Sequence, residues 1–167
     1  MASTQTNAIV QEKGSPKSST RYVNATGQIA GRMCSNVAKL LLGGDSVVIV
    51  NAETTLFSGQ RSSVMQGWFD YLKIASVVHP KHGPFHARTP EGILTRMIRG
   101  MVPRRKSKGV LAMKRLRVYS GTPKQYAKVN FSGFENSMAA KPAAYYIPLS
   151  EIASRIGWKG GSEQVGH

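Results

Sequence analysis

The sequence predicts an α/β domain with a parallel sheet, and three successive segments carry this prediction. Residues 22–25, Tyr-Val-Asn-Ala, have the composition of a short strand. The segment after them repeats apolar residues at the period of an α-helix. Residues 47–50, Val-Val-Ile-Val, form a β-branched run that is typical of a strand covered on both faces. A strand, a helix and a strand in this order form parallel neighbours joined by a right-handed crossover in nearly all proteins.

The first helix is expected to follow the turn at Thr26 and Gly27 and to end at Gly43 and Gly44. Glycine ends helices because it adopts the left-handed conformation without a steric cost. The residues predicted to form the apolar side of this helix are Ile29, Met33, Val37, Leu40 and Leu41.

A second helix is predicted over about residues 59–75, and its apolar stripe is expected to pack on the same sheet. This stripe consists of Val64, Trp68, Tyr71, Leu72 and Ala75. The following stretch, 77–88, contains Pro80, Gly83 and Pro84, so we expect a loop there.

The third helix has the clearest start. Thr89 can cap the free backbone N–H groups, and Pro90 has a φ angle that suits the first helical position. Glu91 suits the positive end of the helix dipole. We expect this helix to run to about Met101 and to end before Pro103.

The remaining elements are shorter. We expect a helix over 109–115, a strand over 116–119 and a last helix over 149–156. Between the last two elements, Pro123, Gly133 and Pro142 interrupt any long helix or strand.

The charge of the chain indicates a polyanionic partner. Lys and Arg number 23 against 8 Asp and Glu, which gives a formal net charge of +15. Between Lys73 and Lys128 there are fourteen Lys or Arg and one acid, Glu91. Such an excess favours nucleic-acid binding over a solvated surface of mixed charge. Arg96 and Arg99 lie three positions apart on the predicted third helix and lead into the basic stretch 104–108, an arrangement suited to phosphate contacts.

Other classes of protein fit the sequence less well. No stretch approaches the roughly 20 apolar residues that span a bilayer. Cys34 is the single cysteine, so neither an internal disulfide nor a cysteine-based zinc cluster can form, which favours a reducing compartment. Residues 1–20 lack the apolar core of a secretory signal, and we expect them to be a disordered tail.

Enzymatic function has little support. The turn over 26–32 has glycines at positions 27 and 31, a spacing that matches neither the phosphate-binding nor the dinucleotide-binding glycine motif. His79, His82 and His86 are separated by prolines and have no nearby carboxylate or cysteine, so they favour a phosphate-facing loop over a metal site. We therefore expect no catalytic residues, no cofactor and no metal.

Several segments resemble the family of the universal large-subunit ribosomal protein number thirteen, in its eukaryotic and archaeal form. They are Asn24-Ala25-Thr26-Gly27 with Gly31-Arg32, Gly83-Pro84-Phe85-His86-Ala87-Arg88, Arg99-Gly100-Met101-Val102-Pro103, Leu116-Arg117-Val118-Tyr119, Gly121-Thr122-Pro123 and Gly157-Trp158-Lys159. The resemblance implies a three-layer α/β/α domain with a four-stranded parallel sheet and irregular basic extensions. It also implies a structural role on large-subunit ribosomal RNA, beside neighbouring large-subunit proteins, in cytosolic ribosomes, with assembly in the nucleolus if the source is eukaryotic.

The sequence thus predicts three parts: a disordered tail at 1–20, an α/β RNA-binding domain at 21–126 and an extended segment with a short helix at 127–167. We expect no membrane or DNA partner. The alternatives are a free-standing RNA chaperone or translational regulator and a small nucleotide-dependent enzyme that uses the turn over 26–32. The residues predicted to contact RNA are Lys73, Lys81, His82, His86, Arg88, Arg96, Arg99, Arg104, Arg105, Lys106, Lys108, Lys114, Arg115, Arg117 and Lys124.

Overall fold

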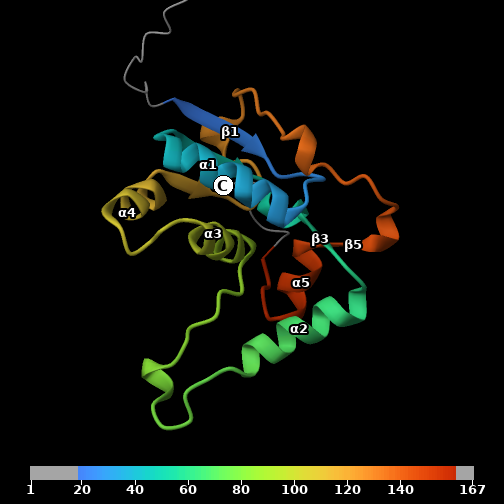
Figure 1. Ribbon diagram of the computed structural model, residues 1–167. Coiled ribbons are helices and arrows are strands. Elements are labelled where there is room, and N and C mark those ends of the chain that lie inside the picture. Colours follow the sequence, from blue (N-terminus) through green and yellow to red (C-terminus); the bar gives the residue numbers. More distant parts are fainter. Residues whose placement is uncertain (1–18, 161–167) are drawn as a thin grey trace, which may run out of the picture.

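A parallel sheet of three strands forms the centre of the fold in the computed structural model, which describes residues 19–160 (Figure 1). The strands are β1 (Thr20–Asn24), β2 (Ser46–Val50) and β4 (Leu116–Val118), in the order β1-β2-β4. The predicted parallel crossover unit is confirmed, and residues 47–50 are all buried.

The number of strands differs from the expected four. At the free edge of β1, Ser132 forms one isolated parallel bridge with Val23 instead of a fourth strand. The N–H of Asn24 donates to the carbonyl of Ser132 at 3.1 Å, and the N–H of Ser132 donates to the carbonyl of Tyr22 at 3.0 Å. Pro123, Gly133 and Pro142 fit this outcome, because they keep the surrounding segment irregular.

The two faces of the sheet are covered differently. Val23, Val47, Ile49 and Leu116 share one hydrophobic core with the buried residues of α1 (Ala30–Gly43) and α3 (Pro90–Met101). On the other face, the ring of Tyr22 contacts the rings of Tyr126 and Phe131, with centroids 5.7 and 6.3 Å apart. An irregular segment therefore covers part of the face that lies opposite the core.

The predicted helix ends are confirmed for α1 and α3. Helix α1 ends at Gly43, and Gly44 follows in the left-handed conformation with φ 109°. At the start of α3, the Thr89 hydroxyl accepts a hydrogen bond from the N–H of Gly92 at 3.3 Å. Helix α4 (Ser107–Lys114) begins two residues earlier than expected, and α5 (Leu149–Arg155) matches the last predicted helix.

Helix α2 (Arg61–Lys73) forms as expected but does not pack on the three-stranded sheet. It lies beside α5 (Figure 1), and Arg61 forms an ion pair with Glu151 of that helix. Trp68 packs edge-on against Phe57, at a centroid distance of 6.1 Å, and is half-buried. Met65 is the one buried residue of α2. The predicted burial of this helix against the sheet is therefore wrong.

A second, two-stranded sheet was not expected from the sequence. Strand β3 (Leu56–Ser58) pairs antiparallel with β5 (Tyr146–Pro148), so that Phe57 faces Ile147 in the register. This pairing brings α5 into the core, where Leu149, Ile152 and Ile156 are buried. Five short 3-10 helices complete the described chain: Ala52–Thr54, Pro80–His82, Lys124–Tyr126, Glu135–Ser137 and Ala143–Tyr145.

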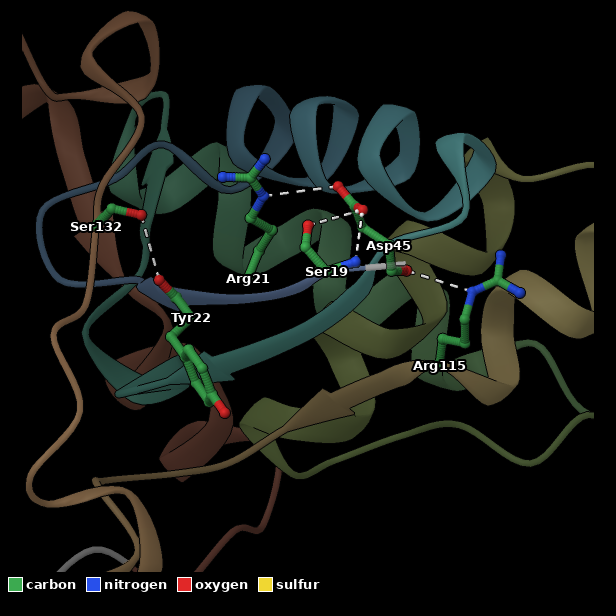
Figure 2. A network of polar contacts seen from close by, with 6 residues as sticks. All are labelled: Ser19, Arg21, Tyr22, Asp45, Arg115 and Ser132. Atoms are coloured by element: carbon green, nitrogen blue, oxygen red, sulfur yellow. Dashed lines mark hydrogen bonds and ion pairs between the residues drawn. The ribbon is translucent and has the colours of Figure 1, made fainter. Parts of the chain in front are cut away.

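A polar network joins the beginnings of the parallel strands to the end of α1 (Figure 2). The carboxylate of Asp45 accepts hydrogen bonds from the hydroxyl and the N–H of Ser19 and lies 3.6 Å from Arg21. These hydrogen bonds, followed by the charge of Arg21, lower the pKa of Asp45 below its ordinary value. The expected tail lies outside the described residues as far as residue 18, and the division of the chain after residue 126 stays a prediction.

Candidate RNA interface

One group of the predicted RNA-contacting side chains is fully available to a partner. These side chains are exposed and form no hydrogen bond or ion pair with the part of the chain that the structure describes. They are Lys81, Arg99, Arg104, Arg105, Lys106, Lys108 and Lys114. All except Lys81 lie on the end of α3, on α4 or on the loop between them. We call these six residues the α3–α4 cation cluster.

The loop of this cluster is held in a fixed turn. The N–H of Arg104 donates to the carbonyl of Val102 at 2.7 Å, and the N–H of Lys106 donates to that of Pro103 at 3.0 Å. Val102 is buried and anchors the turn to the core. Gly109 permits the close return of α4, since a Cβ atom there would lie 2.2 Å from the Pro103 carbonyl oxygen. The cations of the loop are therefore presented from a defined backbone.

The start of α4 adds to the positive potential of the cluster. Lys106 occupies the N-cap position without a side-chain hydrogen bond to the helix, and the first turn of α4 contains no acid. The positive end of a helix dipole favours anions, and phosphate is commonly bound at such ends. The N-terminus of α4 and the lysines and arginines around it thus favour the same kind of ligand.

A second group of the predicted residues is engaged inside the protein. The guanidinium of Arg115 donates to the carbonyls of Leu41 and Asp45, at 2.7 and 3.3 Å, and so binds the end of α1 (Figure 2 shows the Asp45 contact). Arg117 donates to the carbonyls of Lys114 and Leu116, both at 2.9 Å. These guanidinium groups stabilise backbone acceptors.

Arg88 and Arg96 belong to the same engaged group. Arg88 donates to the carbonyl of Ile156 at 3.2 Å, which ties the loop before α3 to the end of α5. Arg96 is half-buried and donates to the carbonyl of Phe85 and, at 3.4 Å, to the hydroxyl of Tyr71. Of the two arginines expected to form a ridge on α3, only Arg99 is left exposed.

The remaining predicted residues are spread over two regions. Lys73 forms an ion pair with Asp70 at 2.9 Å, and Lys124 is exposed on a 3-10 helix. His82 is exposed beside His79 on the loop after α2. His86 instead packs against the ring of Tyr71, and its Nε2 lies 2.7 Å from the carbonyl oxygen of Ile74. His86 thus holds the two arms of that loop together.

Exposed apolar side chains on the same loop were missed by the sequence analysis. Ile74, Val77, Val78 and Phe85 are all exposed. Periodicity could not find them, because two adjacent valines in a segment rich in proline and glycine fit no helical or strand pattern. The available signal is the occurrence of β-branched residues within a predicted loop.

The turn over 26–32 does not offer a phosphate cradle. The N–H groups of Thr26, Gln28 and Ile29 already donate to Asn24, Ala25 and Ser137. Among the described residues, no group of three or more His, Cys, Asp or Glu side chains could hold a metal ion. None of the helices in residues 19–160 is long and apolar enough to cross a membrane.

Burial removes Cys34 from consideration as a nucleophile. The side chain is fully buried in α1, and burial raises the pKa of its thiol to about 12. The thiolate is the reactive form of cysteine, so this thiol stays protonated and inert at neutral pH.

Comparison with known proteins identifies the family. The model of the family described as ribosomal protein L13 matches residues 18–125, well over half of the chain. The chain belongs to the ribosomal protein L13 family. Archaeal members named large ribosomal subunit protein uL13 resemble it over most of its length. The Aeropyrum pernix protein is 38% identical, over 85% of this chain and 92% of its own length. The Saccharolobus solfataricus protein is 35% identical, over 83% and 93%.

The L13 match covers the described strands of the parallel sheet, the helices α1 to α4 and the whole α3–α4 cation cluster. Similarity to a third relative, the uL13 of Methanococcoides burtonii, is 36% over 82% of this chain and 97% of its own length. The cation cluster therefore lies within the part of the chain that the family shares.

Proposed function

We propose that this chain is a structural constituent of the large ribosomal subunit and binds its ribosomal RNA through the α3–α4 cation cluster. Membership of the L13 family supports the ribosomal role. The observation that carries the proposed binding surface is the unpaired state of six cations within one stretch of the described chain, Arg99 to Lys114. Phosphate oxygens are the natural partners of such groups.

The proposed role is that of a scaffold without chemistry of its own. The partners are large-subunit ribosomal RNA and neighbouring ribosomal proteins, in cytoplasmic ribosomes. The engaged arginines, Arg88, Arg96, Arg115 and Arg117, support the binding surface by holding its elements together. RNA contacts by these four residues, and by Lys73, Lys81, His82, His86 and Lys124, remain predictions.

Replacing Arg104, Arg105 and Lys106 together by Ala tests this proposal. Stability should change by no more than about 0.5 kcal/mol, because the three side chains are exposed. Affinity for large-subunit ribosomal RNA should fall. The dependence of log K on log salt should flatten by up to about three contacts, each worth roughly 0.7 to 0.9. Affinity is measured with the purified full chain over a salt series.

Arg32 and Lys39 provide a matched control, because both are exposed on α1, outside the cation cluster. The R32A/K39A variant should keep the wild-type salt slope. If it weakens binding as much as the triple variant does, RNA binding reflects net charge alone and the proposed surface is wrong. Co-sedimentation with large subunits at high salt would separate a resident constituent from a free RNA chaperone.

A further inference from the structure

The segment 74–86 extends away from the body of the protein as a protrusion between α2 and α3 (Figure 1). Its arms are joined where Nε2 of His86 meets the carbonyl of Ile74 at 2.7 Å. They also approach closely at Gly83, where a Cβ atom would lie 3.1 Å from the N atom of Ser76. The guanidinium of Arg96 holds the second arm by donating to the carbonyl of Phe85. The protrusion therefore has a defined shape before any partner binds.

The end of the protrusion is closed by short-range hydrogen bonds. The N–H of His79 donates to the hydroxyl of Ser76 at 3.2 Å, and the N–H of His82 donates to the carbonyl of His79 at 3.0 Å. These contacts form the 3-10 turn Pro80–His82. The two valines that precede this turn are consequently held at the surface.

Apolar side chains on the protrusion are exposed to an unusual degree. Val77 is 95% exposed, Val78 81% and Phe85 71%. Scattered apolar residues are common on protein surfaces, but several of them gathered on one projecting segment indicate a contact site. A partner that removes them from water would gain hydrophobic free energy.

The charge of the protrusion indicates which partner this is. Residues 74–86 include Lys81 and three histidines and contain no acid. The nearest acid along the described chain, Asp70, already forms an ion pair with Lys73. Apolar side chains among cations suit RNA, whose phosphates attract the cations while its base and ribose faces accept apolar contacts.

We propose that the protrusion inserts into the ribosomal RNA, with Val77, Val78 and Phe85 packed against base or ribose faces and Lys81 on a phosphate. This inference rests on the proposed function, but it assigns a binding site of different chemistry. The α3–α4 cation cluster binds charge, whereas the protrusion contributes contacts that depend little on salt.

The test replaces Val77 and Val78 together by Ser in the full chain. The probe is deproteinised large-subunit ribosomal RNA from Saccharolobus solfataricus, titrated over a salt series. Affinity should fall about tenfold, as expected for the loss of packing against a base, while the slope of log K against log salt stays at its wild-type value. Lys81→Ala should instead flatten the slope by about one contact. Thermal unfolding should be unchanged, since both valines are exposed.

Val110 and Leu111 provide the control, because they are a second adjacent apolar pair, 47% and 54% exposed on α4. If V110S/L111S weakens binding equally, the effect is general and the inference is overturned. It is also overturned if V77S/V78S binds the RNA as the wild type does, including the case in which only incorporation into subunits is lost, which would identify a protein partner. In either result the triple variant R104A/R105A/K106A still tests the cation cluster. A wild-type chain that does not bind this RNA would refute the proposed function as well.

Discussion

Two basic segments flank α4 and use their charge in opposite ways. Before the helix, Arg104 and Arg105 extend into solvent and have no partner in residues 19–160. After the helix, Arg115 donates two hydrogen bonds to the end of α1. The difference comes from what lies nearby, because the last carbonyls of a helix lack acceptor partners and carry the negative end of its dipole. A cation near a helix C-terminus stabilises the fold, whereas one on a surface turn remains available to RNA.

The largest effect should come from Gly109→Ala, which moves the exposed segment without changing its charge. The added Cβ would lie 2.2 Å from the backbone oxygen of Pro103, so α4 or the turn before it must shift. We expect a loss of about 1 to 3 kcal/mol in the free energy of unfolding, as for overpacked sites. RNA affinity should fall although every cation is retained. Denaturant unfolding and RNA titration measure the two effects.

Gly100→Ala is the matched control for this change. A Cβ at Gly100, on the exposed side of α3, would meet no atom within 4 Å. Alanine favours helix over glycine by up to about 1 kcal/mol, so this variant should be as stable as the wild type or more so. Equal behaviour of the two variants would show that the turn at Pro103 is not a close contact.

Arg115 and Lys114 are adjacent and provide a direct test of the comparison. Arg115→Ala removes two charge-assisted hydrogen bonds from half-buried carbonyls, which should cost about 2 kcal/mol of stability. Lys114 is exposed, so Lys114→Ala should change stability by less than about 0.5 kcal/mol. It should, however, flatten the salt slope of RNA binding by about one contact. The reverse pattern would contradict the assignment of both residues.

Arg96 and Arg99 repeat this test on one helix, with a smaller expected effect. Arg96→Ala should cost about 1 kcal/mol, because its hydrogen bonds to Phe85 and Tyr71 hold the protrusion and are only partly buried. The loop 74–86 should then become more sensitive to limited proteolysis. Arg99→Ala should leave proteolysis unchanged and weaken RNA binding. Cleavage at equal rates in both variants would show that Arg96 does not position the protrusion.

The elements that the sequence predicted well are those with local signals. Thr89, Pro90 and the apolar positions of α3 specify that helix through contacts within a few residues, and the structure confirms its ends. Helix α2 has an equally clear stripe, but a stripe predicts an apolar side and not the surface it meets. The pairing of β3 with β5, between residues 56 and 148, decides that α2 lies beside α5. A contact across so long a stretch of chain leaves no local pattern.

The candidate site was predicted to a similar extent. Its location in the basic middle of the chain followed from counting charges, and the α3–α4 cation cluster lies there. Counting could not separate Lys114 from Arg115, because the partner of Arg115 is the end of α1, about seventy positions away. Nor could it find the role of Gly109, which depends on a backbone approach that only the fold creates.

The smallest effect should come from Asp45→Asn, on the engaged side of the comparison. The hydrogen bonds from Ser19 and the charge of Arg21 hold the pKa of this carboxyl below its ordinary value of 3.8. A carboxyl with a lowered pKa adds stability that is fully present above its ordinary pKa and is lost as the pH falls through the folded value. The variant should therefore melt at a slightly lower temperature than the wild type near neutral pH. Because the variant cannot titrate at this position, the two melting temperatures should converge as the pH falls below 3.8. A gap that stays constant between neutral and acidic pH would show that the charge of Asp45 does not stabilise the junction of β1, β2 and α1, and would leave Arg115 as the contact that holds it.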